Sequence, residues 1–265
     1  MKVICLVKFT PDVDSFEYDY EKNVIVRDNV KQIINPDDAC ALGFALRLKK
    51  KNPELEIEVV TMAPLSAKKQ MEDILRRRIE KGTILSDAKF GGSDTQATSH
   101  ILGAYLSQAE YDVILTGSQT LDGDTSHVPA QIAELLKIDQ ISGITKIDEE
   151  SFLRGNPQVE VDTEKYVDTY EVAFPAILSV SKVSKYKLPF VRFDDLDLDV
   201  SDQIQILTND DLKLNTSIIG LNGSATRVVQ TYTHEYKNKE KIVVQNDEEG
   251  IEAVYKFLKE NGYLS

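Results

Sequence analysis

The stretch that decides the fold is residues 111–136, YDVILTGSQTLDGDTSHVPAQIAELL. Residues 113–116 form a short apolar run without polar alternation, which predicts a strand buried on both faces. A turn rich in Gly, Asp, Ser and Thr follows, and apolar residues then recur at helical spacing (Val128, Ile132, Leu135 and Leu136). A buried strand followed by an amphipathic helix is the repeating unit of a parallel sheet covered by helices.

The same unit occurs several times before this stretch. Apolar runs at residues 2–7, 55–62 and 83–86 predict further buried strands. Between the strands, apolar residues stand at helical spacing in three groups: Cys40, Phe44 and Leu48; Met71, Ile74 and Ile79; and Ile101, Leu102 and Tyr105. Residues 16–30 alternate in patches and predict a surface hairpin. We therefore expect an α/β protein with a doubly wound, mostly parallel, Rossmann-like sheet.

The pattern changes after Gln140. Residues 144–147, 159–161, 166–172 and 177–180 are β-rich and separated by polar turns, which predicts an antiparallel β extension. Residues 185–230 show little helical periodicity, whereas residues 251–258 carry a helical apolar stripe. The sequence thus predicts a nucleotide-binding domain with its β extension over residues 1–184. Over residues 185–265 it predicts an extended arm and a C-terminal helix that pack on a partner subunit.

Composition narrows the classes of partner. The chain has 265 residues, of which 44 are acidic and 31 basic, so its formal net charge is −13. Such a surface repels phosphate backbones, so we expect no nucleic-acid partner. Cys5 and Cys40 fall in apolar patterns and support neither a disulfide nor a thiolate metal site. The first residues lack the features of a signal peptide and no apolar run reaches membrane length, so we expect a cytoplasmic protein without membrane insertion.

The carboxyl ends of the predicted strands share one chemistry. They lead to Val7 and Lys8, to Thr61 and Met62, and to segments 91–95, 116–119 and 122–126, which are rich in Gly, Ser, Thr and Asp. Small residues let the backbone approach a phosphate, and ligands of such sheets bind at this edge. Each Gly-containing segment alone is better explained as a helix cap, but two of them on one edge favour a ligand site. The sequence has neither GxGxxG after the first strand nor a P-loop pattern.

The order of six segments resembles the electron-transfer flavoprotein β subunits over essentially the whole chain. These segments are VKFTPD (7–12), IINPDDACALGFAL (33–46), VVTMAP (59–64), FGGSDTQAT (90–98), residues 111–136, and GLNGSATRVV (220–229). The most diagnostic piece is Asp-Gly-Asp-Thr at residues 122–125. The resemblance implies a heterodimer whose α subunit carries one FAD and whose β subunit carries either AMP or a second FAD.

The resemblance also implies which residues hold this cofactor. The adenosine would contact Val7, Asn35, Thr61 and Met62. The phosphates would lie against Gly123, Asp124, Thr125 and Ser126, with Thr95 and Thr98 nearby. Lys8, Asp94, Gly117 and Gln119 complete the set of cofactor-binding candidates. Neither a catalytic triad nor metal-ligand spacing is present, and none is expected, because the flavin carries the chemistry of electron transfer.

The Asp-Gly-Asp-Thr segment favours FAD over AMP, since it resembles the electron-bifurcating group, which uses NADH as an electron donor. The alternative is a non-bifurcating subunit that binds only AMP as a structural nucleotide and docking module. The chain departs from the family at Ser118, where Lys is frequent, at Ala63, where Gly is frequent, and at residues 126–129. A redox partner dehydrogenase is implied, and residues 194–199 are either its docking surface or a solvated extended edge.

Overall fold

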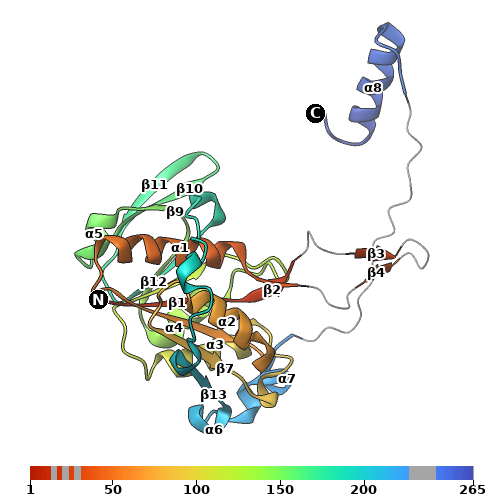
Figure 1. Ribbon diagram of the computed structural model, residues 1–265. Coiled ribbons are helices and arrows are strands. Elements are labelled where there is room, and N and C mark those ends of the chain that lie inside the picture. Colours follow the sequence, from red (N-terminus) through yellow and green to blue (C-terminus); the bar gives the residue numbers. More distant parts are fainter. Residues whose placement is uncertain (13–16, 20–23, 27–30, 227–242, 265) are drawn as a thin grey trace. The chain divides into compact units, whose positions relative to one another are not determined.

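The computed structural model describes residues 1–12, 17–19, 24–26, 31–226 and 243–264 (Figure 1). The chain divides into two compact units, Met1–Arg227 and Val228–Ser265. The described part of the second unit contains helix α8 (Glu248–Glu260), which covers the predicted stripe at residues 251–258. Asp247 caps this helix by accepting a hydrogen bond from Gly250 N–H (2.8 Å).

A nine-stranded sheet forms the centre of the first unit, in the order β11-β10-β9-β12-β8-β1-β6-β7-β13. Every neighbouring pair from β9 to β13 is parallel, and β10 and β11 add an antiparallel edge. The strands are β1 (Lys2–Leu6), β6 (Glu56–Met62), β7 (Lys81–Leu85), β8 (Val113–Gly117), β9 (Asp139–Ile147), β10 (Gln158–Thr163), β11 (Tyr166–Glu171), β12 (Ala176–Val180) and β13 (Ile204–Leu207). The predicted mostly parallel α/β fold is confirmed.

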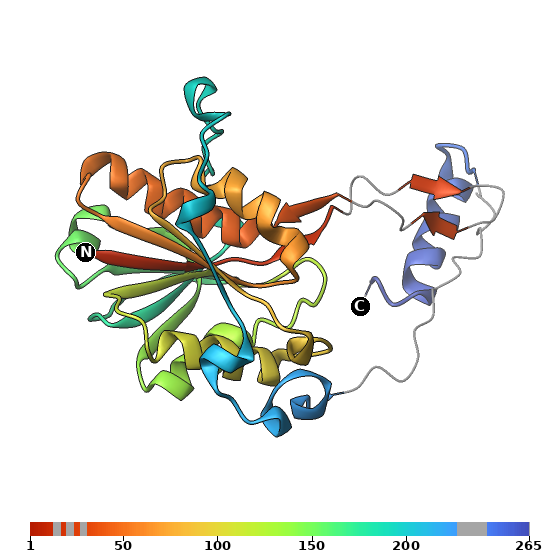
Figure 2. The same ribbon diagram turned by 60° about the horizontal axis from the view of Figure 1, so that its bottom comes forward.

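Helices cover both faces of this sheet (Figure 2). On one face lie α1 (Pro36–Lys51), α2 (Lys68–Leu75) and α5 (Glu149–Leu153), and on the other lie α3 (Thr95–Leu106), α4 (Val128–Leu136) and the short α6 (Asn209–Leu212). The first face includes Phe44, Met71 and Phe152 in its core, and the second includes Ile101 and Ile132. Since the strands are apolar on both sides, neither face can be left to water.

The order of the strands in the sheet shows where a ligand is expected to bind. After β1 the chain builds β6 and β7 on one side and then crosses to β8 on the other side of β1. The crevice beyond the carboxyl ends of β1 and β8 is therefore the topological switch point, where ligands of doubly wound sheets bind. Helix α1 begins there, with Pro36 at its first position and two acids, Asp37 and Asp38, in its first turn.

Two strands depart from the prediction. Residues 177–180 were expected in the antiparallel extension, but β12 lies inside the sheet and is parallel to both β8 and β9. Residues 185–230 were expected to leave the domain, but β13 joins the sheet as its edge strand, parallel to β7. A four- or five-residue apolar run has no local feature that identifies its neighbour or direction, so sequence patterns miss both placements.

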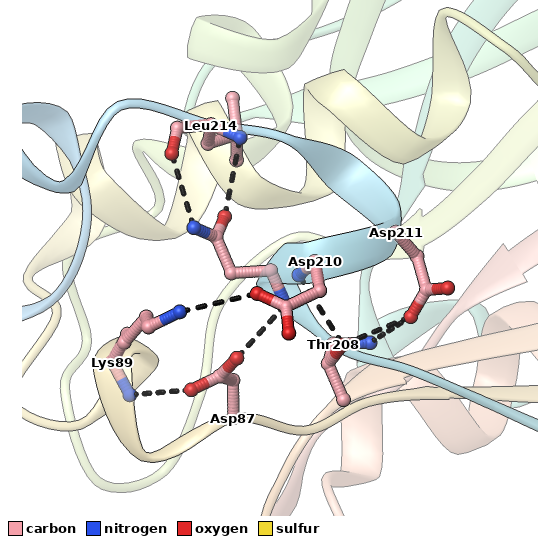
Figure 3. A network of polar contacts seen from close by, with 7 residues as sticks. Asp87, Lys89, Thr208, Asp210, Asp211 and Leu214 are labelled. Atoms are coloured by element: carbon pink, nitrogen blue, oxygen red, sulfur yellow. Dashed lines mark hydrogen bonds and ion pairs between the residues drawn. The ribbon is translucent and has the colours of Figure 1, made fainter.

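A polar network fastens β13 and α6 to the loop after β7 (Figure 3). Asp87 Oδ1 accepts from Lys89 N–H (2.8 Å), and its Oδ2 accepts from Asn209 N–H (2.9 Å). Lys89 Nζ in turn pairs with Asp210 Oδ1 at 3.2 Å. Thr208 and Asp211 form a capping box at the start of α6. Residues 204–212 are thus held to the domain that contains β7.

Two small antiparallel pairs lie outside the main sheet. Strand β2 (Phe9–Pro11) pairs with β5 (Gln32–Ile34), and β3 (Glu17–Asp19) pairs with β4 (Val24–Val26). The second pair lies in the predicted hairpin of residues 16–30, whose turn at residues 21–23 is outside the described residues. Among the described helices, none is long and apolar enough to cross a membrane.

Candidate functional site

A pocket of about 330 Å³ lies at the carboxyl ends of β1, β6 and β8. Leu6, Val60, Met62 and Leu102 provide an apolar wall, and the polar lining comes from the segments 93–98 and 116–127. This volume lies at the lower end of the range of about 300–1,000 Å³ that is typical of small-molecule sites. A lining that contains both apolar side chains and polar loop segments suits a ligand with a flat base and a phosphate.

Most of the predicted cofactor-binding residues line this one pocket. They are Val7, Lys8, Met62, Asp94, Thr95, Thr98, Gly117, Gln119, Gly123, Thr125 and Ser126. Asn35, Thr61 and Asp124 lie outside the lining. Thr61 is 1% exposed, and its Oγ1 makes no hydrogen bond with the described residues. The structure thus brings together residues from five separate segments of the chain.

Asn35 holds the loop that follows β8. Its side chain is 1% exposed; Nδ2 donates to the Gln119 carbonyl (2.7 Å), and Oδ1 accepts from Leu121 N–H (3.2 Å). Both polar groups of the amide are therefore used within the protein. Asn35 thus shapes the loop that lines the pocket, and its contact with the adenosine stays a prediction.

Asp37 and Asp38 also bind the loop after β8, and they connect it to two further segments. We call the contacts of Asn35, Asp37 and Asp38 with these segments the loop bracket. Asp38 Oδ2 accepts from Lys8 N–H and Oδ1 from Gly117 N–H, both at 2.8 Å. Asp37 Oδ2 accepts from Gln119 N–H (3.3 Å), and Oδ1 accepts from Lys182 N–H (3.2 Å). The first turn of α1 therefore ties the carboxyl ends of β1, β8 and β12 together. From the sequence, two acids in the first turn of a helix are explained by the helix dipole. The sequence therefore did not indicate that they bind the backbone of distant loops.

Close packing makes this bracket rigid. A Cβ at Gly117 would lie 2.3 Å from Asp38 Oδ1 and 2.7 Å from Asp37 Cβ, so only glycine fits at this position. Burial raises the pKa of Asp38 to about 7, although the N–H groups of Lys8 and Gly117 oppose the rise. Cys5 in β1 is also buried, and its burial raises the pKa of its thiol far above the ordinary value, so the thiol stays protonated.

An ion pair closes the loop over the end of β1. Lys8 Nζ lies 2.8 Å from Asp122 Oδ1 and 2.7 Å from Oδ2. Burial raises the pKa of Asp122, but the hydrogen bond and charge of Lys8 outweigh burial and hold this pKa below its usual range. Lys8 thus lines the pocket as a cation that is already paired.

The loop at residues 122–126 leads to an open helix start. Asp124 and Ser126 have φ angles of 48° and 57°, a left-handed backbone that non-glycine residues adopt rarely and mostly at sites that constrain them. Helix α4 then begins after His127, and no side chain caps it. The segment is therefore not the N-cap of α4. The uncapped N–H groups at the start of α4 and the helix dipole favour an anion beside Thr125 and Ser126.

The start of α3 is capped instead. Asp94 Oδ1 accepts from Ala97 N–H (3.0 Å), so the cap interpretation holds for this residue. Asp94 Oδ2 also accepts from the N–H (2.9 Å) and hydroxyl (3.0 Å) of Thr226, and Ser224 Oγ accepts from Asp94 N–H (2.8 Å). The glycine-containing segment near residue 223 therefore packs against the rim of the pocket.

Several lining residues were not among the candidates: Leu6, Asp38, Val60, Ser93, Leu102, Thr116, Ser118, Thr120, His127, Val128 and Pro129. Most of them are one or two positions from a predicted residue, so a wider window at each strand end would have found them. Leu102 stands one helical turn after Thr98 and could have been found from that spacing. Within the described ranges, no cluster of three or more His, Cys, Asp or Glu side chains could hold a metal ion.

The acidic residues 194–199 do not form an extended edge with one apolar face. Phe193–Asp195 is a 3₁₀ turn, and Asp195 is 8% exposed. Both carboxylate oxygens of Asp195 bind Arg78, at 3.0 Å to Nε and 3.2 Å to Nη2. The prediction of a solvated extended edge was wrong because Arg78, 117 positions earlier in the chain, turns Asp195 inward.

Comparisons with known proteins identify relatives of the whole chain. The family model for the electron transfer flavoprotein domain matches residues 22–185. The electron transfer flavoprotein subunit beta of Clostridium acetobutylicum is 32% identical over 273 aligned residues, which cover 100% of both chains. The caffeyl-CoA reductase-Etf complex subunit CarD of Acetobacterium woodii is 32% identical and covers 88% of each chain. Protein FixA of Azotobacter vinelandii is 30% identical over 92% of this chain and 88% of its own.

Proposed function

This chain belongs to the electron transfer flavoprotein family as a relative of its β subunits, and from this premise we propose that it binds FAD in the pocket at the switch point and passes electrons in a heterodimer. The observation that carries the proposal is the start of α4, which no side chain caps, beside Thr125 and Ser126 in a pocket that apolar side chains also line. When bound, the flavin supplies the reversible uptake and release of electrons.

The residues of this chain bind and orient that group. The wall of Leu6, Val60 and Met62 takes the adenine, because a flat aromatic base gains most from leaving water against apolar side chains. Thr125 and Ser126 present hydroxyl and N–H donors to the phosphates, where the dipole of α4 adds attraction. Asn35, Asp37 and Asp38 fix the loops so that these donors need no rearrangement on binding.

AMP alone is the second candidate for the same pocket. The observation in its favour is the volume of about 330 Å³, which lies at the low end for cofactor sites and suits the adenosine monophosphate portion. In that case the chain would be a structural nucleotide-binding and docking module. The candidate residues are the same for both ligands, because FAD also contains the adenosine and phosphate groups.

The proposal extends to partners and to the electron donor. We assign the exposed apolar side chains of α8, among them Ile251, Val254 and Phe257, to contact with an α subunit. Relatives named as a subunit of a caffeyl-CoA reductase-Etf complex and as an acryloyl-CoA reductase electron transfer subunit support a dehydrogenase or reductase as redox partner. If the pocket holds FAD, we further propose that NADH is the electron donor and that the heterodimer carries out electron bifurcation.

The deciding measurement is the cofactor content of the chain purified with its α subunit. We expect two flavins per heterodimer by visible absorption, and release of FAD from both chains on denaturation. One flavin together with released AMP would favour the second candidate. A heterodimer with one flavin and no adenine nucleotide at the β chain would overturn the proposed function.

Replacing Thr125 by valine should lower the affinity of the β-chain cofactor roughly tenfold to a hundredfold, because one hydrogen bond to a charged phosphate contributes about 1.5–3 kcal/mol. The matched control is Thr169→Val, the same substitution at an exposed threonine of β11 that does not line the pocket. Titration of the apoprotein with FAD or AMP measures both variants. Equal affinities in Thr125→Val and the unmodified chain would remove Thr125 from the phosphate site.

A further inference from the structure

A second pocket, of about 340 Å³, lies against the last two turns of α1. Its lining comes from α1 and from the segment 184–189, and it consists of Gly43, Arg47, Lys50, Ser184, Lys185, Tyr186, Lys187 and Pro189. No residue lines both this pocket and the one at the switch point. Asp38 and Lys50 are separated by about 18 Å along the helix axis, at 1.5 Å per residue, so the two pockets are distinct.

The charge of this pocket is opposite to that of the chain. Four of its lining residues are cationic and none is acidic, in a protein whose net charge is −13. Arg47 pairs with Glu149 at 2.5 Å, but Glu149 is shared with Lys51 at the same distance. In the part of the chain that the structure describes, Lys50, Lys185 and Lys187 make no ion pair.

The backbone that carries two of these lysines is held firmly. A Cβ at Gly43 would lie 2.7 Å from the Lys187 carbonyl carbon and 2.9 Å from Leu188 N, so the segment rests directly on α1. Between the two lysines, the Tyr186 ring packs on Phe44 at 5.0 Å, and its hydroxyl accepts from Ile147 N–H at 2.9 Å. Lys185 and Lys187, on either side of the half-buried Tyr186, are both exposed.

We propose that this pocket is a second ligand site, which binds a small phosphate-bearing anion through Lys50, Lys185 and Lys187. Like charges held this close repel one another, and a di- or trianion relieves that repulsion. The concave shape and the volume suit a small molecule such as a diphosphate rather than the convex surface of a protein.

The test is a calorimetric titration of the full chain with inorganic pyrophosphate. We expect saturable one-site binding at this pocket that weakens as salt rises, because the attraction is between exposed charges. The double variant Lys185→Gln, Lys187→Gln should lose at least tenfold in affinity. The matched control is Lys69→Gln, an exposed lysine of α2 that pairs with no described acid. It should bind as the unmodified chain does.

A second measurement locates the ligand, because pyrophosphate could also enter the pocket at the switch point. In amide chemical-shift mapping, changes at Ser184, Tyr186 and Gly43 that vanish in the double variant would support the proposal. Changes confined to residues 93–98 and 117–128, or an affinity that the double variant leaves unchanged, would overturn it. Because both lysine side chains are exposed, we expect the double variant to have the same melting temperature as the unmodified chain. An unchanged melting temperature excludes a folding defect as the cause of lost binding.

Discussion

Replacing Asp38 by alanine should destabilise the protein by about 2–6 kcal/mol. Lys8 N–H and Gly117 N–H would both lose their acceptor. Each buried N–H group without a hydrogen-bond acceptor costs about 1–3 kcal/mol. The same change should weaken nucleotide binding, since the ends of β1 and β8 line the pocket. Urea unfolding measures the first effect, and titration with AMP or FAD at a temperature where the variant is folded measures the second. Stability within 1 kcal/mol of the unmodified chain would contradict this account.

The pH dependence of stability gives this prediction a second readout. Because the pKa of Asp38 in the folded state is about 7 and its unfolded value is 3.8, the folded protein binds an extra proton between these pH values. Stability should therefore fall as pH rises from about 4 to about 7. In Asp38→Asn the slope should be smaller, and the remainder comes partly from Asp37, whose pKa burial also raises. Equal slopes in both proteins would show that Asp38 stays ionised.

Replacing Glu58 by alanine should cost about 3 kcal/mol, at the lower end of the loss seen when one partner of a buried ion pair is removed. Glu58 lies in β6 and is 1% exposed. Its carboxylate accepts hydrogen bonds from Thr83 (2.8 Å) and Tyr105, and it pairs with Lys2 (3.3 Å) and Lys81 (3.1 Å). Both lysines are partly exposed and can turn to water, whereas the two hydroxyls are left without this acceptor. Thermal or urea unfolding measures the loss.

The matched variant Glu58→Gln separates hydrogen bonding from charge. Its amide oxygen still accepts from one hydroxyl, so we expect a smaller loss than for alanine. Burial raises the pKa of Glu58, but the hydrogen bonds from Tyr105 and Thr83 and the charge of Lys81 outweigh it, so the net pKa is lowered. The stabilisation is thus complete above about pH 4.5 and is lost as pH falls below that value. An alanine variant as stable as the unmodified chain at pH 7 would refute this role.

The fold class could be predicted because its signals are local. Residues 113–116 and the stripe from Val128 to Leu136 carry the periods of a buried strand and an amphipathic helix, and β8 and α4 form there. Since all strands of a parallel sheet end on one edge, the same reasoning brought Val7, Met62 and Thr125 to one pocket. The resemblance to electron-transfer flavoprotein β subunits is also confirmed.

The sequence by itself determined the alternation of strands and helices up to about residue 140 and which edge of the sheet holds the polar loops, because hydrophobic period and turn chemistry depend on neighbours in the chain. Only the tertiary structure decided that β12 lies between β8 and β9, that Asn35 binds a loop 84 residues away, and that Asp195 faces Arg78. A polar side chain has the same local pattern whether it meets a ligand, water or a distant backbone group. Its role is fixed by contacts that exist only after the elements have packed.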